Sequence, residues 1–580
     1  MAMTLEQATE QVIATDPRYA LGTEVIRGVE HKIFVNAPKS LRDLQRVGLE
    51  VREAARDDRP YVVYEDQRIA YRDWVAETNR MAHALTDRLG VGPGDRVAIA
   101  MRNYPEYLTL IMAIASVGAV AVLVNAWWTT EELRYGFEDS QAKIVFADGP
   151  RAERLAPFAD EMGLRVVAVR DEVAAAVATY DGLLAKSGNE SWPKIAIDPD
   201  ADFAVMYSSG STGHPKGVVL THRGAIAATY SWLMAFSLVP LMTDPPLDPD
   251  APKIPQTLLC ATPLFHVTAT HPLFLLSIPL GAKLVMMRKW DGEEAVRVIE
   301  AEEVTRFLGV PTMTADIAEA AKRMGKTLPT LANLASGGAK RPPAQVAEQQ
   351  EVFPNAAVAT GYGMTETNAL GIGLQGEEYL ARPNACGRLY PPLQELRIVD
   401  DEGEPLPTGE IGEIAIKCVT QMREYLNQPE ATAETIRDGW LHTGDLGMVD
   451  DEGYVTIVDR KKNIIIRGGE NIAALEVEAA IHQHPKVMEA GCFPIPDQRL
   501  GEVVGAAVML RDGAQLTKAE LEGFLAERLA KFKLPSEVWL TSAPLIRGAT
   551  DKIDRRALKA ACLADDKGAA AGLCYDGGPA

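Results

Sequence analysis

Short apolar runs alternate with amphipathic helical patterns through most of the chain. The runs are rich in β-branched residues and are bounded by turn residues, which is typical of buried strands. Strands are expected at Val97–Met101, Ala119–Val124 and Ile144–Ala147, with helices between them at Pro105–Val117 and Glu131–Phe137. A repeating strand–helix order favours parallel strands with helices packed on the sheet. The chain therefore predicts an α/β fold with layered, mostly parallel sheets.

The pattern changes near residue 445, where the α/β repeat gives way to a compact mixture of strands and helices. The charged segment Arg460–Asn463 precedes this region and is expected to act as a hinge. We expect a large N-terminal domain at 1–459, a hinge at 460–463, a small mobile α+β domain at 464–563 and a disordered tail at 564–580. The Pro- and Asp-rich segment Leu238–Pro255 predicts a surface loop.

Composition and charge fit a globular protein with a small-molecule partner. The chain has 580 residues, of which 47% are apolar and 24% are charged, so several compact units are expected. The net charge of -21 argues against a nucleic-acid partner, because nucleic-acid binding depends on Lys and Arg that displace counterions. A small anion is not excluded, since it needs only a local basic or amide-lined pocket.

Cysteine spacing and the apolar segments bear on the cellular compartment. The six cysteines form no CxxC pair, so neither a zinc site nor a disulfide framework is predicted. Met1–Tyr19 carries three acidic residues where a secretory signal needs an apolar region. Leu108–Val124 is about as long as a short membrane span, but Gly118 and the β-branched second half predict a buried helix, a turn and a strand. We expect a cytoplasmic protein with at most peripheral membrane contact.

The strongest local motif is Tyr207–Gly217, in which an apolar strand runs into a loop of hydroxyls and glycines that ends in Lys216. Glycines let backbone N–H groups approach an anion, hydroxyls donate hydrogen bonds, and lysine adds positive charge. The composition predicts a polyphosphate-binding loop. It is not a Walker A loop, because Gly217 follows the lysine where Ser or Thr would be needed. The candidate phosphate-binding residues are Ser208, Ser209, Gly210, Ser211, Thr212, Gly213 and Lys216.

Further motifs follow in order along the chain, at Gly361–Thr367, Gly439–Asp445, Asp459–Lys462, Gly468–Ile472 and Lys552–Arg556. Together with the phosphate loop they resemble the adenylate-forming superfamily, which includes acyl-CoA synthetases, firefly-type luciferases and peptide-synthetase adenylation domains. The resemblance extends from about residue 50 to residue 562. It implies an ATP-dependent acyl-CoA synthetase that joins a carboxylic acid to AMP and then passes the acyl group to coenzyme A.

The resemblance implies a nucleotide site built from several of these motifs. Tyr362 offers a ring for stacking on adenine, and Thr365 can donate a hydrogen bond to an α-phosphate oxygen. Glu366 is a hard oxygen ligand suited to a Mg²⁺ ion shared with the substrate phosphates. Taken alone, Thr365 would fit a helix N-cap equally well. The other ATP-binding residues that the resemblance implies are Gly337, Gly338, Ala339, Gly363, Asp445 and Arg460, the last two at the ribose.

Lys552 is the candidate catalytic lysine. In the family this residue bridges the carboxylate and phosphate oxygens, where its charge offsets the repulsion between two anions. Asp551 stands where the family has glycine, which leaves a weakened adenylation step open. By the same resemblance Lys462 is the hinge residue. Gly468 and Gly469 are implied to line the pantetheine tunnel of coenzyme A once the small domain has rotated.

Pro263–His266 resembles the acyl-pocket gate of the family, with His266 beside the carboxylate as a catalytic candidate and Phe265 as an apolar wall. The stretch after Phe265 holds no acid that could pair with an α-amine, so an amino-acid substrate is disfavoured. The apolar pocket set predicts a medium- or long-chain fatty acid, with a steroid-side-chain or aromatic acid as alternatives. Its other candidates are Tyr230, Trp232, Met234 and Val310, together with Pro311 and Met313.

Two other functions stay open at this point. An acyl-AMP ligase would pass its adenylate to a carrier-protein thiol and would not turn over coenzyme A. A non-catalytic homologue would bind ATP without releasing pyrophosphate. The sequence leaves the choice between a monomer and a homodimer open as well.

Overall fold

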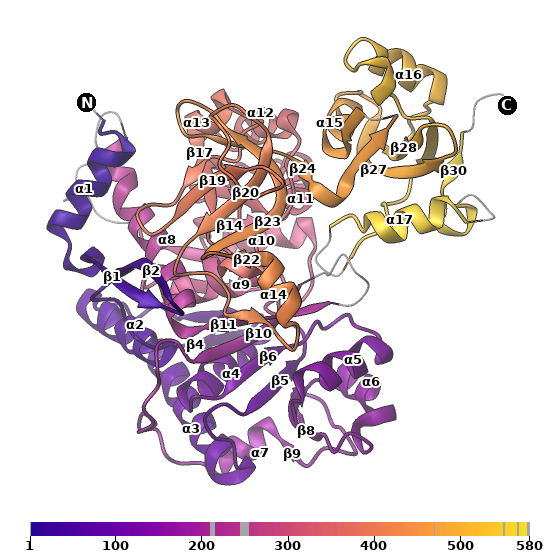
Figure 1. The fold of residues 1–580 in the computed structure, drawn as a ribbon. Helices are drawn as coiled ribbons and strands as arrows, with labels where there is room; N and C mark the ends of the chain where they lie inside the picture. Colours follow the sequence, from indigo (N-terminus) through magenta and orange to yellow (C-terminus); the bar gives the residue numbers. More distant parts are fainter. Residues whose placement is uncertain are drawn as a thin grey trace.

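The computed structural model describes residues 2–208, 215–243, 254–468, 470–548, 552–564 and 568–576. Figure 1 shows a large N-terminal domain and a small C-terminal domain, drawn in orange to yellow, that meet beyond strand β24 (Val455–Arg460). The large domain contains three multistranded sheets and the two-stranded β1–β2 hairpin (Leu21–Ile26 and Val29–Phe34), and the small domain contains one six-stranded sheet. The predicted fold class is confirmed.

The first large sheet has eight strands in the order β21-β11-β10-β6-β5-β7-β8-β9. Its central strands β6, β5, β7 and β8 pair in parallel, and helices α4 (Pro105–Ser116), α5 (Thr130–Ser140) and α6 (Gly149–Ala159) connect them. The strand–helix alternation expected from the sequence is confirmed in this layer. The strands are β5 (Arg96–Ala100), β6 (Val120–Leu123), β7 (Ile144–Ala147), β8 (Arg165–Ala168), β9 (Ala178–Thr179), β10 (Asp202–Ser208), β11 (Lys216–Thr221) and β21 (Glu424–Tyr425).

The second large sheet has nine strands in the order β18-β17-β16-β15-β14-β12-β13-β3-β4. The run from β16 to β3 is parallel, so the carboxyl ends of β14, β15 and β16 lie at one edge. Helices α10 (Gly292–Ala301), α11 (Pro311–Met324) and α12 (Pro343–Val352) connect β13 to β16. The strands are β3 (Val62–Tyr64), β4 (Gln67–Ile69), β12 (Thr257–Cys260), β13 (Lys283–Met286), β14 (Arg306–Gly309), β15 (Asn333–Gly337), β16 (Ala357–Tyr362), β17 (Ile372–Gln375) and β18 (Arg388–Leu389).

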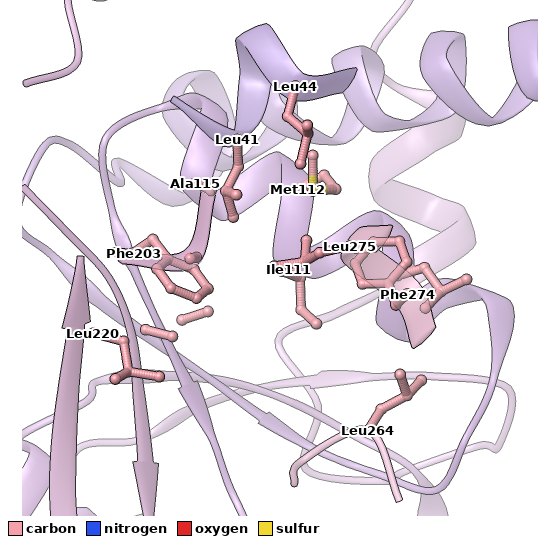
Figure 2. Packing of buried hydrophobic residues seen from close by; sticks show 14 of the residues in the cluster. Leu41, Leu44, Ile111, Met112, Ala115, Phe203, Leu220, Leu264, Phe274 and Leu275 are labelled. Atoms are coloured by element: carbon pink, nitrogen blue, oxygen red, sulfur yellow. The ribbon is translucent and has the colours of Figure 1, made fainter. Parts of the chain in front are cut away.

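Helix α4 lies at the centre of the largest apolar core. Figure 2 shows Ile111 and Met112 of this helix among side chains from distant segments, including Leu44 of helix α2 (Leu41–Ala55) and Phe274. Gly118 follows at φ +72° and turns the chain into β6. The predicted buried helix, glycine turn and strand in this apolar run are therefore confirmed.

Helix α8 (His222–Met242) is longer than the sequence suggested. The expected loop from Leu238 is wrong up to Met242, because the helix packs against α1 (Leu5–Thr15) and the N–H of Met3 donates to the Leu241 carbonyl at 3.0 Å. Residues 244–253 of that loop lie outside the described residues. By length and composition alone α8 could cross a membrane, but 61% of its apolar window is buried within the protein.

A third sheet, in the order β19-β20-β23-β22 with β24 paired to β23, completes the large domain. The 3₁₀ turn Lys461–Asn463 then leads into the small domain. The strands of the third sheet are β19 (Glu395–Val399), β20 (Gly412–Lys417), β22 (Ile436–Arg437) and β23 (Trp440–Val449). The small domain comprises β25 (Ile464–Arg467), β26 (Glu470–Ala473), β27 (Val487–Asp497), β28 (Gly501–Leu510), β29 (Glu537–Thr541), β30 (Cys574–Tyr575), α15 (Ala474–His482), α16 (Lys518–Ala526) and α17 (Arg555–Cys562).

The prediction of a disordered tail is wrong for residues 568–576. Strand β30 pairs antiparallel with β29, and the Leu573 side chain is only 5% exposed, in a cluster with Trp539 and Leu545. The N–H of Lys518 donates to the Asp576 carboxylate at 2.6 Å. A few residues with large side chains supply this packing, so the overall composition of the tail did not reveal it.

Candidate active site

A continuous cleft of about 3370 Å³ extends between the two domains and into the large one. It includes the carboxyl ends of β15 and β16, the β23–β24 pair and part of the small domain. Ligand sites in parallel α/β sheets usually lie at the carboxyl ends of the strands. The predicted nucleotide, catalytic and hinge residues that line this cleft are Ser208, Lys216, His266, Gly337, Gly338, Ala339, Tyr362, Gly363, Thr365, Glu366, Asp445, Arg460, Lys462 and Lys552.

The predicted phosphate loop connects β10 to β11. Ser208 and Lys216 pair at the base of this antiparallel hairpin, and both line the cleft. The Lys216 ammonium lies 4.5 Å from the centroid of the Tyr425 ring. The predicted members Ser209, Gly210, Ser211, Thr212 and Gly213 lie outside the described residues, as do Gly469 and Asp551.

Tyr362, Asp445 and Arg460 form a connected polar group on one wall of the cleft. The Tyr362 hydroxyl donates to one oxygen of the Asp445 carboxylate at 2.7 Å, and Arg460 Nε contacts the other at 2.9 Å. Burial raises the pKa of Asp445, while the charge of Arg460 and the tyrosine hydrogen bond oppose the rise. Each carboxylate oxygen has a second lone pair, so Asp445 can still accept hydrogen bonds from a vicinal diol.

Lys552 of the small domain reaches this wall of the large domain. Gly338 has φ +78°, a conformation that favours glycine, and a Cβ added there would lie 2.9 Å from Lys552 Cε, so the lysine side chain ends close to this turn. Burial and, to a smaller extent, the charge of Arg460 lower the pKa of Lys552 to about 8, while Asp445 acts in the opposite direction. The structure therefore places a poorly solvated lysine next to the polar group just described.

Gly363, Thr365 and Glu366 lie on a tight turn after β16. A Cβ on Gly363 would approach the Ala369 carbonyl oxygen to 2.1 Å, so only glycine fits there. Thr365 and Glu366 belong to a short 3₁₀ turn, and both are nearly buried. This turn presents the Thr365 and Glu366 side chains to the same cleft as Lys552.

Glu366 is the candidate metal ligand. The Tyr425 hydroxyl donates to Glu366 Oε1 at 2.7 Å, and the N–H of Met422 donates to its carbonyl at 2.7 Å. No group of three or more His, Cys, Asp or Glu side chains that could hold a metal occurs in the described part of the chain. A single oriented carboxylate fits Mg²⁺, which commonly takes one or two protein carboxylates and completes its shell with substrate phosphates and water.

His266 and Phe265 lie where the cleft continues into the large domain. The His266 Nδ1 atom is 3.2 Å from the Thr268 hydroxyl, and burial, with the nearby charge of Lys552, lowers the histidine pKa to about 3. The imidazole is therefore neutral at physiological pH and can exchange hydrogen bonds without carrying charge. Phe265 packs edge-to-face on Trp127, with ring centroids 5.0 Å apart.

Two of the predicted acid-pocket residues do not face the cleft. Trp232 lines the cleft together with Phe236, one helical turn further along α8. Tyr230 and Met234 occupy the opposite side, where Tyr230 lies 6.5 Å from the Phe34 ring and both belong to the apolar core. The prediction for Tyr230 and Met234 is therefore wrong, because residues two apart on a helix point in nearly opposite directions. Val310, Pro311 and Met313 line the cleft as predicted.

Gly468 lies in the small domain away from the cleft lining. Its φ is +61°, and its N–H donates to the Leu500 carbonyl at 2.7 Å. The structure therefore brings Lys552, but not Gly468, to the large domain.

The sequence prediction did not include two arginines that line the cleft, the buried Arg341 and the half-buried Arg306. Arg341 follows Ala339 and Lys340 and is 2% exposed, and none of its guanidinium nitrogens has a hydrogen-bond partner in the described part of the chain. Arg306 begins strand β14. For Arg341 the sequence signal was its position just after the glycine-rich turn at 337–338. For Arg306 it was a charged residue at the start of an apolar strand.

The chain belongs to the family of AMP-binding enzymes. The model of that family matches residues 49–426, and the model of the AMP-binding enzyme C-terminal domain matches residues 476–549. The first match includes strands β10, β11, β14, β15 and β16 of the cleft, and the second covers most of the small domain, while Asp445, Arg460 and Lys552 lie outside both matched ranges. The resemblance inferred from the motifs is confirmed.

Similar proteins include several acid–CoA ligases. The chain is 34% identical to a feruloyl-CoA synthase from an Amycolatopsis species over 80% of this chain and 89% of the relative. It is 30% identical to a 4-coumarate–CoA ligase from Vanilla planifolia over 85% and 89%, respectively. The o-succinylbenzoate CoA synthetase of Bacillus subtilis, solved with its acyl-adenylate intermediate, has a TM-score of 0.75 and 29% identity over 88% of this chain and 97% of that chain. Because these relatives are named for aromatic acids, the predicted fatty-acid substrate is not confirmed.

Proposed function

We propose that this protein is an AMP-forming acid–CoA ligase that activates an aromatic carboxylic acid. The observation that carries the proposal is the position of Lys552, which extends from the small domain to Gly338 and the Asp445–Arg460 pair of the large domain. A lysine in this position can contact an α-phosphate and a carboxylate together.

In the first half-reaction a carboxylate oxygen attacks the α-phosphorus of ATP, and pyrophosphate leaves as the new acyl–phosphate bond forms. The two reactants are both anionic, so positive charge in a poorly solvated site lowers the barrier. Lys552 supplies that charge, and the Thr365 hydroxyl adds a donor in the same cleft. Asp445 and Tyr362 hold the nucleoside, and the neutral His266 orients the acid without adding charge.

Glu366 would hold Mg²⁺ against the phosphates, with its carboxylate oriented by the Tyr425 hydroxyl. When bound, the ion supplies charge neutralisation to the pyrophosphate leaving group. Lys216, at the base of the phosphate hairpin, contributes a further positive charge from the protein itself.

In the second half-reaction the thiol of coenzyme A attacks the acyl carbon, the bond to phosphate breaks, and AMP leaves. Lys552 must first vacate the site, because it fills the space beside Gly338. Rotation at residues 460–463, with Lys462 as its pivot, would withdraw this lysine and present the Gly468 turn instead. Small-domain motion at a few residues that end secondary-structure elements is a common hinge mechanism.

The walls of the acid side favour a flat, aromatic substrate. Trp127 and Phe265 pack edge-to-face at its entrance, while Trp232 and Phe236 of α8 form one side of its interior. Aromatic rings prefer edge-to-face or offset contacts with other rings, so this lining suits an aryl group. The names of the feruloyl-CoA synthase and 4-coumarate–CoA ligase relatives support the same substrate class.

Pyrophosphate release tests the proposal directly. Purified protein is given MgATP with cinnamic, benzoic and C6 to C16 fatty acids, each with and without coenzyme A. We expect pyrophosphate with the aromatic acids and a thioester product only when coenzyme A is present. Higher kcat/KM for a fatty acid would overturn the substrate class, and pyrophosphate without any CoA thioester would favour a carrier-protein acceptor. ATP binding without pyrophosphate release would refute the enzymatic function.

A further inference from the structure

Arg306 places a positive charge in the interior of the acid side of the cleft. It is the first residue of β14 and lines the cleft together with Leu308 and Val310. Alternate residues of a strand point to the same face, so the Arg306 and Leu308 side chains follow one wall. The Arg306 guanidinium carbon lies 4.4 Å from the centroid of the Phe236 ring of α8. The charged end therefore lies among the walls proposed to contact the acid.

This guanidinium has no ion pair and no side-chain hydrogen bond within the described part of the chain. Two other arginines do have acidic partners, whereas the buried Arg341 has no hydrogen-bond partner among the described residues. Arg52 lies 3.1 Å from Asp57, and Arg555 lies 2.6 Å from Glu478. A poorly solvated charge without a partner is unfavourable, so this half-buried, unpaired guanidinium on the cleft wall is available to an acceptor group that a ligand brings.

The electrostatic surroundings agree with that interpretation. Burial lowers the pKa of Arg306 to about 10, and the opposing influence is that of Tyr390. At neutral pH the guanidinium therefore remains charged. The Tyr390 ring also lines the cleft, and its hydroxyl packs against Gly373, where a Cβ would come within 2.2 Å. Arginine and tyrosine together offer several donors but no strong acceptor.

Strand register places Arg306 far from the nucleotide end of the cleft. Arg306 pairs with Asn333 of β15, whereas the nucleotide end of β15 is Gly337, which pairs with Gly361. Four residues of extended strand span about 13 Å. Lys552 is in contact with the turn at Gly338, so the reacting carboxylate and Arg306 lie at opposite ends of the acid side.

We propose that Arg306 selects acids that carry a second, anionic oxygen group at the end of the molecule remote from the reacting carboxylate. The inference rests on the proposed ligase function and specifies its substrate class further. A distal carboxylate fits best, because a guanidinium binds a carboxylate through two parallel hydrogen bonds and neutralises its charge. A distal hydroxyl would accept one hydrogen bond and leave the charge uncompensated.

A series of para-substituted cinnamic acids tests this selection on one scaffold. The acids carry 4-carboxy, 4-hydroxy or 4-methyl groups, and kcat/KM for pyrophosphate release is measured for each. For the native enzyme we expect 4-carboxy to exceed 4-methyl on the order of 10- to 100-fold, as expected for charge-assisted hydrogen bonds, with 4-hydroxy between them. Arg306→Leu should abolish or reverse the order, and Arg306→Lys should keep part of it.

The control is Arg323→Leu, which removes an arginine of the surface whose side chain is 63% exposed, and should leave the order unchanged. If Arg306→Leu lowers kcat/KM for all three acids by one common factor, the residue is structural and the proposal is overturned. A native preference for 4-methyl overturns it too. Calorimetry of the three acids binding to the protein with AMP separates this proposal from the ligase function. Tighter binding of the 4-carboxy acid that depends on Arg306, without pyrophosphate release, would refute the ligase function and support acid selection by Arg306.

Discussion

Replacing Lys552 with alanine should separate the two half-reactions of this enzyme. The lysine side chain lies beside Gly338, Arg460 and Asp445, in a site whose low solvation already lowers the lysine pKa to about 8. Two unit charges about 4 Å apart interact by about 4 kcal/mol at an effective dielectric constant near 20. Loss of that interaction in the transition state corresponds to about a 10³-fold slower adenylation.

Two assays measure the separate steps. Adenylation is followed by acid-dependent exchange of labelled pyrophosphate into ATP, and thioester formation is followed after synthetic acyl-AMP and coenzyme A are supplied. We expect Lys552→Ala to lose about 10³-fold in the first assay and less than about threefold in the second, because the lysine has left the site when the thiol attacks. Lys531→Ala, at an exposed position of the same domain, is the matched control. Equal losses in both assays would refute the role assigned to Lys552.

Three further predictions concern pH, the nucleotide site and the tail. The charged form of Lys552 is present below a pKa of about 8 and is lost above it, so kcat/KM for adenylation should fall about tenfold per pH unit above pH 8. Lys552→Arg should remove this alkaline decrease from the pH profile. Tyr362→Phe deletes the 2.7 Å hydrogen bond to Asp445, so steady-state kinetics should show about a tenfold higher KM for ATP with an unchanged rate from supplied acyl-AMP; an unchanged KM would contradict the nucleotide assignment. Leu573→Ala should lower the free energy of unfolding by about 2–5 kcal/mol in urea titrations, whereas Leu563→Ala, whose side chain is 43% exposed, should change it by less than about 0.5 kcal/mol; equal effects would mean that the β30 segment adds little stability.

Contiguous motifs could be predicted from the sequence because their chemistry depends on neighbours in the chain. Thr365 and Glu366 share one tight turn that Gly363 makes possible, so their joint presentation follows from local geometry. The α/β class was predictable for a similar reason, since the nearly continuous apolar run of α4 and the short β-branched runs beside it already indicate a buried helix between buried strands.

The parts that were missed depend on contacts between distant segments. The faces of α8 could not be assigned from composition, because Tyr230 and Trp232 are both aromatic and only the surrounding packing distinguishes core from cleft. The ordered tail depends on a few contacts of residues such as Leu573 with the small-domain core. Composition averages over such contacts and cannot detect them.

By itself the sequence determined the family, the order of the site motifs and the need for two domains, because each of these is written in short runs of residues. Only the tertiary structure decided which residues meet: it joins Tyr362 to Asp445 across 83 positions and brings Lys552 to Gly338. It also leaves Arg306 with no acidic partner among the described residues of the acid side. Pairing and desolvation depend on distances between side chains, and those distances exist only after the chain has folded.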